Sequence, residues 1–212
     1  MRRYDLQVHT DASPCSRASP EEVVEAAVDV GLDGIAITNH DTLEGYYAVN
    51  ALAPRSLTVI PGIEVTTTQG HLLALDVEEV PPQGDPLTVI NAIHNQKGLA
   101  ILSHPFDKLR EYYTDNLDEI AGRIDGIEVL NSRCIVPQYN QRARTFAEEH
   151  NLAITGGSDA HFPMEVGRAF TICDEPILDA IRTDGTETGG RGGYLSGHIA
   201  TKLNDALTRL NV

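Results

Sequence analysis

The sequence has no apolar run long enough to cross a bilayer, and it has only three cysteines and three lysines. A membrane-spanning helix needs about 20 mostly apolar residues, so we expect a soluble, cytoplasmic protein without a membrane partner. An odd number of cysteines, in a chain with no signal-peptide pattern, excludes a disulfide framework. Cys173 ends an apolar run and is expected in the core, whereas Cys15 and Cys134 stand beside polar motif residues.

Positive charge is also scarce: 16 Lys and Arg residues stand against 31 Asp and Glu residues, for a formal net charge of −15. Such a surface repels nucleic acid phosphates. We therefore expect no strong binding of duplex nucleic acid. A nucleic acid substrate would have to be drawn in locally by metal ions or by a few arginines.

The length of 212 residues and the hydrophobic fraction of 41% predict one folded domain over residues 1–212. Residues 183–193 are polar and glycine-rich, which predicts a mobile loop and not a linker between domains. Residues 196–210 fit a closing helix.

Short apolar runs alternate about seven times with helical patterns. The first helix has the clearest start, because Ser19, Pro20 and Glu22 fit a capping box with proline in the first turn. The pair Pro61-Gly62 is expected to interrupt one strand. Strands are predicted at 4–9, 34–38, 57–60, 63–65, 71–77, 99–102, 125–130, 152–155 and 167–173. Further helices are predicted at 43–52, 86–96, 117–124, 138–150 and 177–182.

The apolar runs lack the in-and-out alternation of antiparallel sheets, which indicates parallel strands covered by helices. A doubly wound sheet and a barrel both satisfy this pattern. In a barrel the carboxyl ends of all strands form one ring, whereas an open sheet spreads them along an edge. Because polar functional groups follow nearly every strand, we predict a barrel.

Possible metal ligands stand at these strand ends. The clearest case is Gly156 to His161, where two glycines end a strand and Asp159 and His161 are two residues apart, so that they point the same way in extended chain. The whole set comprises Gln7, His9, Cys15, His40, Glu64, His104, Glu128 or Asn131, Cys134, Asp159 and His161.

Imidazole, carboxylate and thiolate together favour zinc, manganese or iron over magnesium or calcium. The groups are too many for one tetrahedral ion, which predicts more than one ion per chain. Glu64 is the natural bridge, since an unpaired charge inside the apolar run 63–65 would be costly.

Each residue also has a plainer interpretation. His104 before Pro105 could cap a turn, Cys15 could be a small core residue, and Glu64 could pair with an arginine. A metal centre is favoured because independent accidents would not all fall at strand ends. The role of His71 stays open, and plain surface or helix positions are expected for His94, His150 and His198.

Five ordered stretches resemble the motifs of the PHP (polymerase and histidinol phosphatase) family. They are residues 5–10, 37–42, 61–64, 103–105 and 157–161. The resemblance implies a distorted (β/α)7 TIM-like barrel with two or three divalent transition metals at its carboxyl-terminal face. It also implies hydrolysis of phosphoesters by metal-activated water.

By this resemblance, His9, Glu64 and Asp159 would hold a first ion. Glu64 and His104 would hold a second, with Cys134 or Asn131 as the remaining option. The third would be held by Cys15, His40 and His161. The resemblance makes Glu64, His104, Asp159 and His161 the catalytic residues.

Three positions depart from the family pattern. Gln7 replaces a histidine, Asn39 replaces an aspartate, and Cys15 is the nearest substitute for an aspartate of the first loop. A carboxamide oxygen is a weaker ligand than imidazole, so we expect the first ion to bind weakly. Asn39 is expected to lie behind His40 and to tune it.

The sequence therefore predicts a metal-dependent enzyme that hydrolyses a phosphate mono- or diester of a nucleotide or a small phosphorylated metabolite. Arg17 and Arg133 are the candidates for contacts with substrate phosphate, although either could simply serve solubility. Two alternatives remain open. One is a histidinol-phosphate phosphatase, and the other is a non-catalytic metal-binding domain that serves a partner protein.

Overall fold

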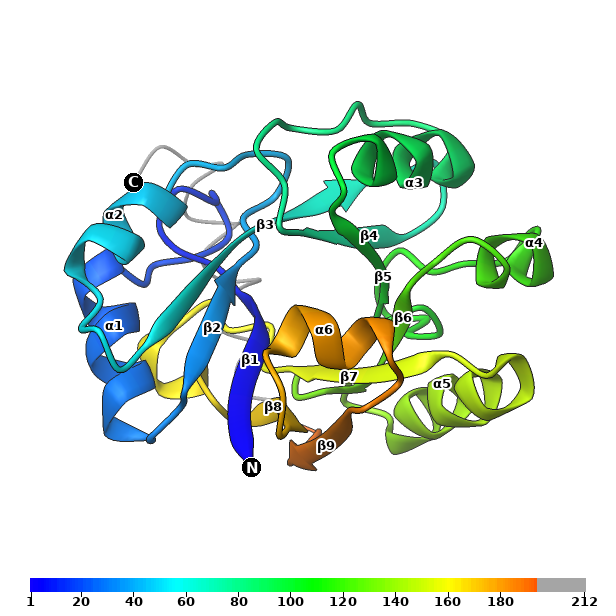
Figure 1. Cartoon of the computed structure of the whole chain (residues 1–212). Helices are drawn as coiled ribbons and strands as arrows, with labels where there is room; N and C mark the ends of the chain where they lie inside the picture. The colour runs from blue at the N-terminus through cyan, green and yellow to red at the C-terminus, as the bar shows by residue number, and fades with distance from the viewer. Residues whose placement is uncertain (194–212) are drawn as a thin grey trace.

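The computed structural model describes residues 1–193, and the helix expected at 196–210 lies outside them. One nine-stranded sheet has the order β7-β6-β5-β4-β3-β2-β1-β8-β9 and curves into a nearly closed barrel (Figure 1). Its strands are β1 (Arg2–Val8), β2 (Gly34–Ile37), β3 (Thr58–Thr66), β4 (His71–Leu75), β5 (Leu99–Ser103), β6 (Gly126–Asn131), β7 (Ala153–Gly157), β8 (Ala169–Cys173) and β9 (Glu187–Gly190). The helices are α1 (Pro20–Asp29), α2 (Tyr46–Leu52), α3 (Pro86–Asn95), α4 (Leu117–Ala121), α5 (Pro137–His150) and α6 (Ile177–Arg182), with a 3-10 turn at Pro163–Glu165.

The barrel closes where the segment after β7 meets the end of β1. The backbone N–H of Asp159 donates to the carbonyl of Gln7 at 2.8 Å, and the backbone N–H of His9 donates to the carbonyl of Ala160 at 2.9 Å. These bonds place the segment after β7, the first strand in the sheet order, beside β1, the seventh. The predicted fold class, a distorted TIM-like barrel, is confirmed.

The expectation that every strand is parallel is wrong for two of them. β4 runs antiparallel to both β3 and β5, and β8 runs antiparallel to β1 and β9. The register pairs Thr66 with His71, so only four residues join β3 to β4. So short a connection permits a hairpin but not the crossover that a parallel pair needs.

β3 is continuous, although Pro61-Gly62 had been expected to interrupt it. Its first half, to Pro61, pairs with β2, and its second half, from Gly62, pairs with β4. Pro61 therefore stands where the strand changes partner. Its missing N–H costs little there, and its carbonyl accepts a hydrogen bond from Asp76 at 2.8 Å.

Two other boundaries differ from expectation. The second helix begins at Tyr46 and not at 43, because Gly45 precedes it with φ of +88°. Within residues 183–193, expected as a loop, Glu187–Gly190 form β9 and pair with β8. Periodicity does not reveal such a strand, because Thr-Gly-Gly carries almost no apolar side chain.

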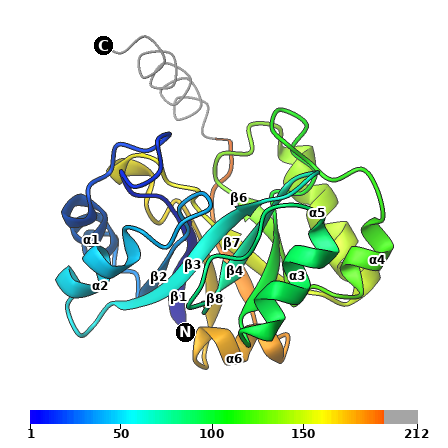
Figure 2. The same ribbon diagram turned by 90° about the horizontal axis from the view of Figure 1, so that it is seen from above.

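The core closes one end of the barrel and leaves the other for polar groups. Leu6, Leu73 and Ile101 of the barrel pack with Ile177 and Ile181 of α6. Figure 2 shows α6 at the same end as the start of β1. α1 and α2 cover the outer side of β1 to β3, and α3, α4 and α5 cover that of β3 to β6. The carboxyl ends of β1, β2 and β3 thus lie away from the end of the barrel that α6 and this apolar cluster close.

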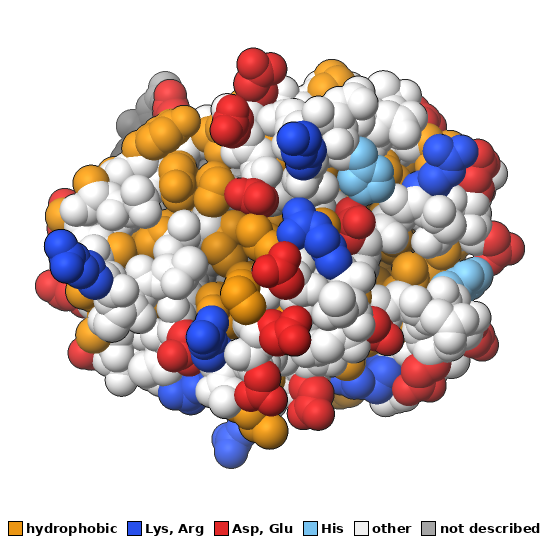
Figure 3. All heavy atoms as spheres, in the orientation of Figure 1, with side chains coloured by type: hydrophobic (Ala, Val, Ile, Leu, Met, Phe, Trp, Pro, Cys, Tyr) orange, Lys and Arg blue, Asp and Glu red, His pale blue; other side chains and the backbone are white. Residues whose placement is uncertain are grey.

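No helix within residues 1–193 is both long and apolar enough to cross a membrane. On the face shown in Figure 3, Asp and Glu side chains are scattered among Lys and Arg side chains. Positive charge forms no continuous patch on that face, in keeping with the net charge of −15.

Candidate metal centre

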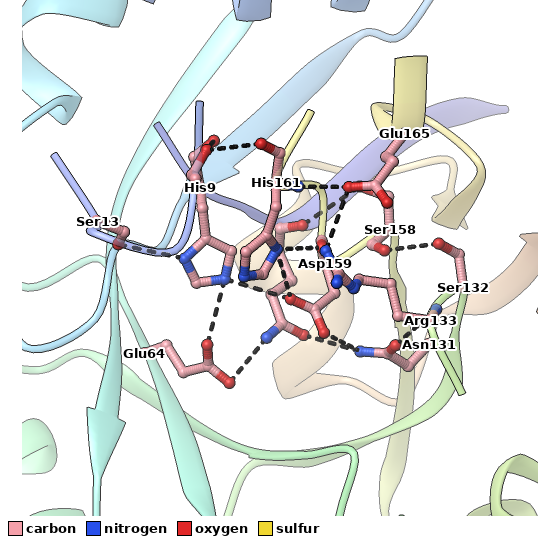
Figure 4. Close-up of polar contacts among 12 residues, drawn as sticks. His9, Ser13, Glu64, Asn131, Ser132, Arg133, Ser158, Asp159, His161 and Glu165 are labelled. Atoms are coloured by element: carbon pink, nitrogen blue, oxygen red, sulfur yellow. Dashed lines mark hydrogen bonds and ion pairs between the residues drawn. The ribbon is translucent and has the colours of Figure 1, made fainter. Parts of the chain in front are cut away.

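The strand ends bring most of the predicted ligands together. His9 follows β1, His40 follows β2, Glu64 lies on β3, and His104 follows β5. Asp159 and His161 follow β7 and turn toward His9 and Glu64 (Figure 4). All of these side chains are buried except that of His40, which is 30% exposed.

Glu64 lies at the middle of the cluster. Its Oε2 is 3.2 Å from Nε2 of His9 and 3.5 Å from Nδ1 of His40, and its Oε1 is 3.0 Å from Nε2 of His104. Burial would raise the pKa of Glu64, but the surrounding imidazoles, led by His40 and His71, hold it well below its usual range. Glu64 is therefore ionised and central to every part of the cluster.

The donor atoms form three overlapping groups, and within each group all of them lie within 4.8 Å of one another. The groups share two residues, Glu64 and His9, so that they adjoin. Their members are His9, Glu64 and Asp159; Glu64, His71 and His104; and His9, Cys15, His40 and His161.

The cluster fits divalent transition metals because buried imidazole nitrogens in it have no hydrogen-bond partner. They are Nε2 of His9, Nδ1 of His71 and Nδ1 of His104. A buried polar atom left unpaired is costly. The Nε2 atom of His9 also lies between two carboxylate oxygens, 3.2 Å from Glu64 and 3.3 Å from Asp159. A cation bound between these atoms would satisfy Nε2 of His9 together with the two carboxylate oxygens.

Backbone strain is concentrated at two of these residues. His104 has φ of +27° and Asp159 has φ of +57°, values that L-residues rarely adopt. Gly157, two residues before Asp159, must be a glycine for packing, since a Cβ there would come within 2.8 Å of the Gln7 side chain and 2.9 Å of Glu128. The paired glycines in the sequence thus let β7 approach β1 closely.

Buried polar groups hold the ligand-bearing loops from behind. Oε2 of Glu165 accepts hydrogen bonds from the backbone of His161 at 2.7 Å and Phe162 at 3.1 Å. Asn39 accepts from the backbone of Thr10 at 2.8 Å and donates to its hydroxyl at 2.9 Å. Asn39 therefore ties the loop after β1 to the loop after β2, and lies behind the ligands as expected.

Three of the predicted site residues form hydrogen bonds at the edge of the cluster. Gln7 donates to Oε1 of Glu64 at 2.9 Å. Cys134 lies 3.5 Å from Oδ2 of Asp107. Asn131 donates to both Gln7 and Asp159, at 3.2 and 3.3 Å. These three side chains border the cluster on one side.

The two predicted phosphate contacts differ in their surroundings. Arg17 is exposed, and its backbone N–H donates to the carbonyl of His161 at 3.0 Å. Arg133 has only 3% of its side chain exposed, and its Nη1 is 3.3 Å from Glu165. The geometry thus leaves Arg17 beside the cluster on the surface and directs Arg133 into the interior.

Two residues of the cluster were not predicted from the sequence. His71 starts β4 and is 3.8 Å from Glu64, because the hairpin brings it back beside β3. Arg110, from the loop after β5, forms an ion pair with Asp159. His71 could have been found had the antiparallel pairing been foreseen. No motif marks Arg110.

Comparison with known proteins agrees with this geometry. A family model described as PHP-associated matches residues 137–184. The uncharacterized protein MJ0417 of Methanocaldococcus jannaschii is 31% identical over 79% of this chain and 69% of its own length. The chain belongs to the PHP family. The predicted membership is thereby confirmed.

Other relatives of this PHP chain extend the comparison. The 5'-3' exoribonuclease Rnm of Salmonella typhimurium is 26% identical over 81% of this chain, which spans about half the length of that enzyme. A two-domain Bacteroides vulgatus protein with a predicted PHP-like metal-dependent phosphoesterase is similar in structure. The TM-score is 0.77 at 21% identity, covering 90% of this chain and 65% of that one. This last likeness concerns the fold.

Proposed function

We propose that this PHP chain is a metal-dependent phosphoesterase whose centre is built around Glu64. The observation that carries the proposal is that Glu64 belongs to two groups of donors, one with His9 and Asp159 and one with His71 and His104. A carboxylate shared in this way can bridge two ions, and paired ions are typical of phosphoester hydrolysis. When bound, such ions would polarise the phosphoryl group and make a water molecule nucleophilic near neutral pH.

The residues of the chain would fix and orient this centre. The imidazoles, carboxylates and thiol that would donate are those of His9, Cys15, His40, Glu64, His71, His104, Asp159 and His161. This set adds His71 to the ligands predicted from the sequence, and Gln7 and Cys134 border it. Because imidazole and thiol donors predominate, zinc, manganese or iron would suit the centre.

We infer that the substrate is a nucleotide or another small phosphorylated molecule. The name of the exoribonuclease relative supports a phosphodiester, and Arg17 at the edge of the cluster supports the binding of an anionic group. The acidic surface favours a small or single-stranded substrate over duplex nucleic acid.

The test combines metal analysis with a substrate panel. The chain is purified without chelator, loaded with zinc or manganese, and assayed on a nucleoside monophosphate, a short RNA and histidinol phosphate. We expect more than one metal equivalent per chain and turnover of at least one nucleotide substrate. Turnover of histidinol phosphate alone would favour that phosphatase activity. Metal without any turnover would favour the non-catalytic alternative, and a chain that takes up no metal would refute the proposal.

A further inference from the structure

The loop between β5 and α4 carries a guanidinium group into the side of the metal centre. Arg110 forms an ion pair with Oδ2 of Asp159 through Nη1, and its Nε is 3.0 Å from Oδ2 of Asp107. Its Nη2 is 3.3 Å from Oδ1 of Asn131 and 3.8 Å from Sγ of Cys134. One cation thus contacts two carboxylates, a carboxamide oxygen and a thiol.

These four partners are themselves buried. Asp107 and Asn131 have no exposed surface, and Asp159 and Cys134 each have 1% exposed. Two buried carboxylates of like charge that face the same point need a counter-charge. Carboxylate, carboxamide and thiol groups are also donors that metal ions use. The groups that surround the guanidinium of Arg110 are therefore of the kinds that could bind a metal ion.

Gln7, which departs from the family pattern, lies on the same side of the centre. The Nδ2 atom of Asn131 donates to Oε1 of Gln7 at 3.2 Å and to Oδ2 of Asp159 at 3.3 Å. Gln7 stands where the resembling motif has a histidine. The guanidinium of Arg110 therefore lies on the side of the centre where this imidazole is missing.

We propose that the guanidinium of Arg110 takes the place of one metal ion, so that the centre binds one ion fewer than its donors could hold. The inference rests on the proposed metal centre. Arginine is suited to this part because its charge is permanent and its donors are spread in a fork. The remaining oxygen of Asp159, Oδ1, faces His9 at 3.3 Å and His161 at 3.5 Å and stays available to the other groups.

The test counts bound metal in Arg110→Met, which keeps much of the side-chain volume and removes the charge. Each protein is equilibrated with manganese or zinc, and the metal per chain is measured by elemental analysis and by calorimetric titration. We expect Arg110→Met to bind one equivalent more than the parent chain. Arg110→Lys, which keeps a positive charge, should bind as many as the parent, and so should the surface control Arg55→Met.

A double variant tests where the additional metal ion binds. Arg110→Met combined with Asp107→Asn should lose the additional equivalent, because Asp107 supplies one of the two carboxylates. If Arg110→Met folds only when metal is present, with a thermal midpoint that rises with metal concentration, a metal ion has replaced the guanidinium and the proposal is supported.

Other outcomes would overturn the inference. Equal metal content in Arg110→Met and the parent would do so, and so would an Arg110→Met chain that stays unfolded at saturating metal while Arg110→Lys folds. An unchanged metal count with weaker binding of inorganic phosphate would make Arg110 a substrate contact instead. A parent chain that binds no metal at all would refute the proposed function itself, which separates the two failures.

Discussion

The side-chain amide of Gln7 donates a 2.9 Å hydrogen bond to Oε1 of Glu64, and both side chains are buried. The carbonyl oxygen of Gln7 accepts from Asn131 at 3.2 Å and from Ser103 at 3.4 Å. Both ends of the carboxamide are thus engaged. Gln7 orients Glu64 in this arrangement.

Replacing Gln7 with histidine should strengthen metal binding. An imidazole at this position can add a ligand beside His9, Glu64 and Asp159, and each tenfold gain in affinity corresponds to about 1.4 kcal/mol. We expect a gain of about tenfold, seen as higher occupancy and activity at limiting metal and little change at saturation. Competition with a coloured chelator measures it.

The control for this experiment is Gln83→His, which adds an imidazole at an exposed position outside the hydrogen-bond network of Gln7. An equal gain in both variants would mean that any added histidine scavenges metal. A loss of affinity in Gln7→His would show that the hydrogen bond to Glu64 matters more than an extra ligand.

Replacing Glu64 with glutamine should abolish most activity. The substitution removes the charge that faces His9, His40 and His104, and with it the bridge proposed between two ions. A loss of about 2.7 kcal/mol in transition-state stabilisation lowers kcat/KM about 100-fold, and we expect at least that. Steady-state assays at saturating metal measure it, with Glu21→Gln on exposed α1 as the matched control. A Glu64→Gln chain with parental kcat/KM would remove the bridge from the mechanism.

Replacing His71 with alanine should lower metal content and activity together. His71 faces Glu64 at 3.8 Å, and its Nδ1 has no hydrogen-bond partner. The matched control is His150→Ala, since His150 lies at the end of α5 and pairs with Asp118. We expect a loss of about one metal equivalent at limiting metal in the first variant and none in the second. Parental metal content in His71→Ala would exclude a ligand role.

Most of the centre could be predicted because motifs at strand ends can be located in the sequence even when the pairing of the strands is predicted wrongly. His9, His40, Glu64, His104 and His161 all follow apolar runs, and a barrel brings such ends together whichever way individual neighbours pair. The contacts found among them depend on local sequence and on closure of the sheet, both of which the pattern captures.

What could not be predicted depends on pairing direction and on loops. His71 was left open because a parallel β4 would place its first residue at the far end of the barrel, whereas the hairpin reverses it. Arg110 lies in a loop with no periodicity, and its partners Asp107, Cys134 and Asp159 come from three separate segments. Neither a spacing nor a propensity reports such a convergence.

The protonation of His9 supplies a last prediction. Burial would lower the pKa of His9, but the carboxylates of Asp159 and Glu64, 3.3 and 3.2 Å from its Nε2, outweigh it and raise the pKa to about 9 in the metal-free chain. Burial lowers the pKa of His40, His104 and His161, so those imidazoles are neutral near pH 7. At that pH a proton on His9 therefore competes with metal.

The protonation of His9 makes both the stability of the metal-free fold and the affinity for metal depend on pH. A raised pKa stabilises the metal-free fold most below the unfolded value of 6.5, and this contribution is lost as pH rises through about 9. Metal binding runs the other way, because the ion needs neutral imidazole. Between pH 6.5 and 8.5 the proton displaced from His9 should contribute about a tenfold rise in metal affinity per pH unit.

Calorimetry in buffers of different ionisation enthalpy counts the protons released when manganese binds at pH 7.5. The parent chain should release about one proton more than His9→Asn, each measured at saturating metal. Subtracting the variant removes protons that come from other groups or from water. His161→Asn is the matched control, since burial already keeps His161 neutral, and it should release as many protons as the parent. Equal release from the parent and His9→Asn would show that His9 is not the protonated member of the cluster.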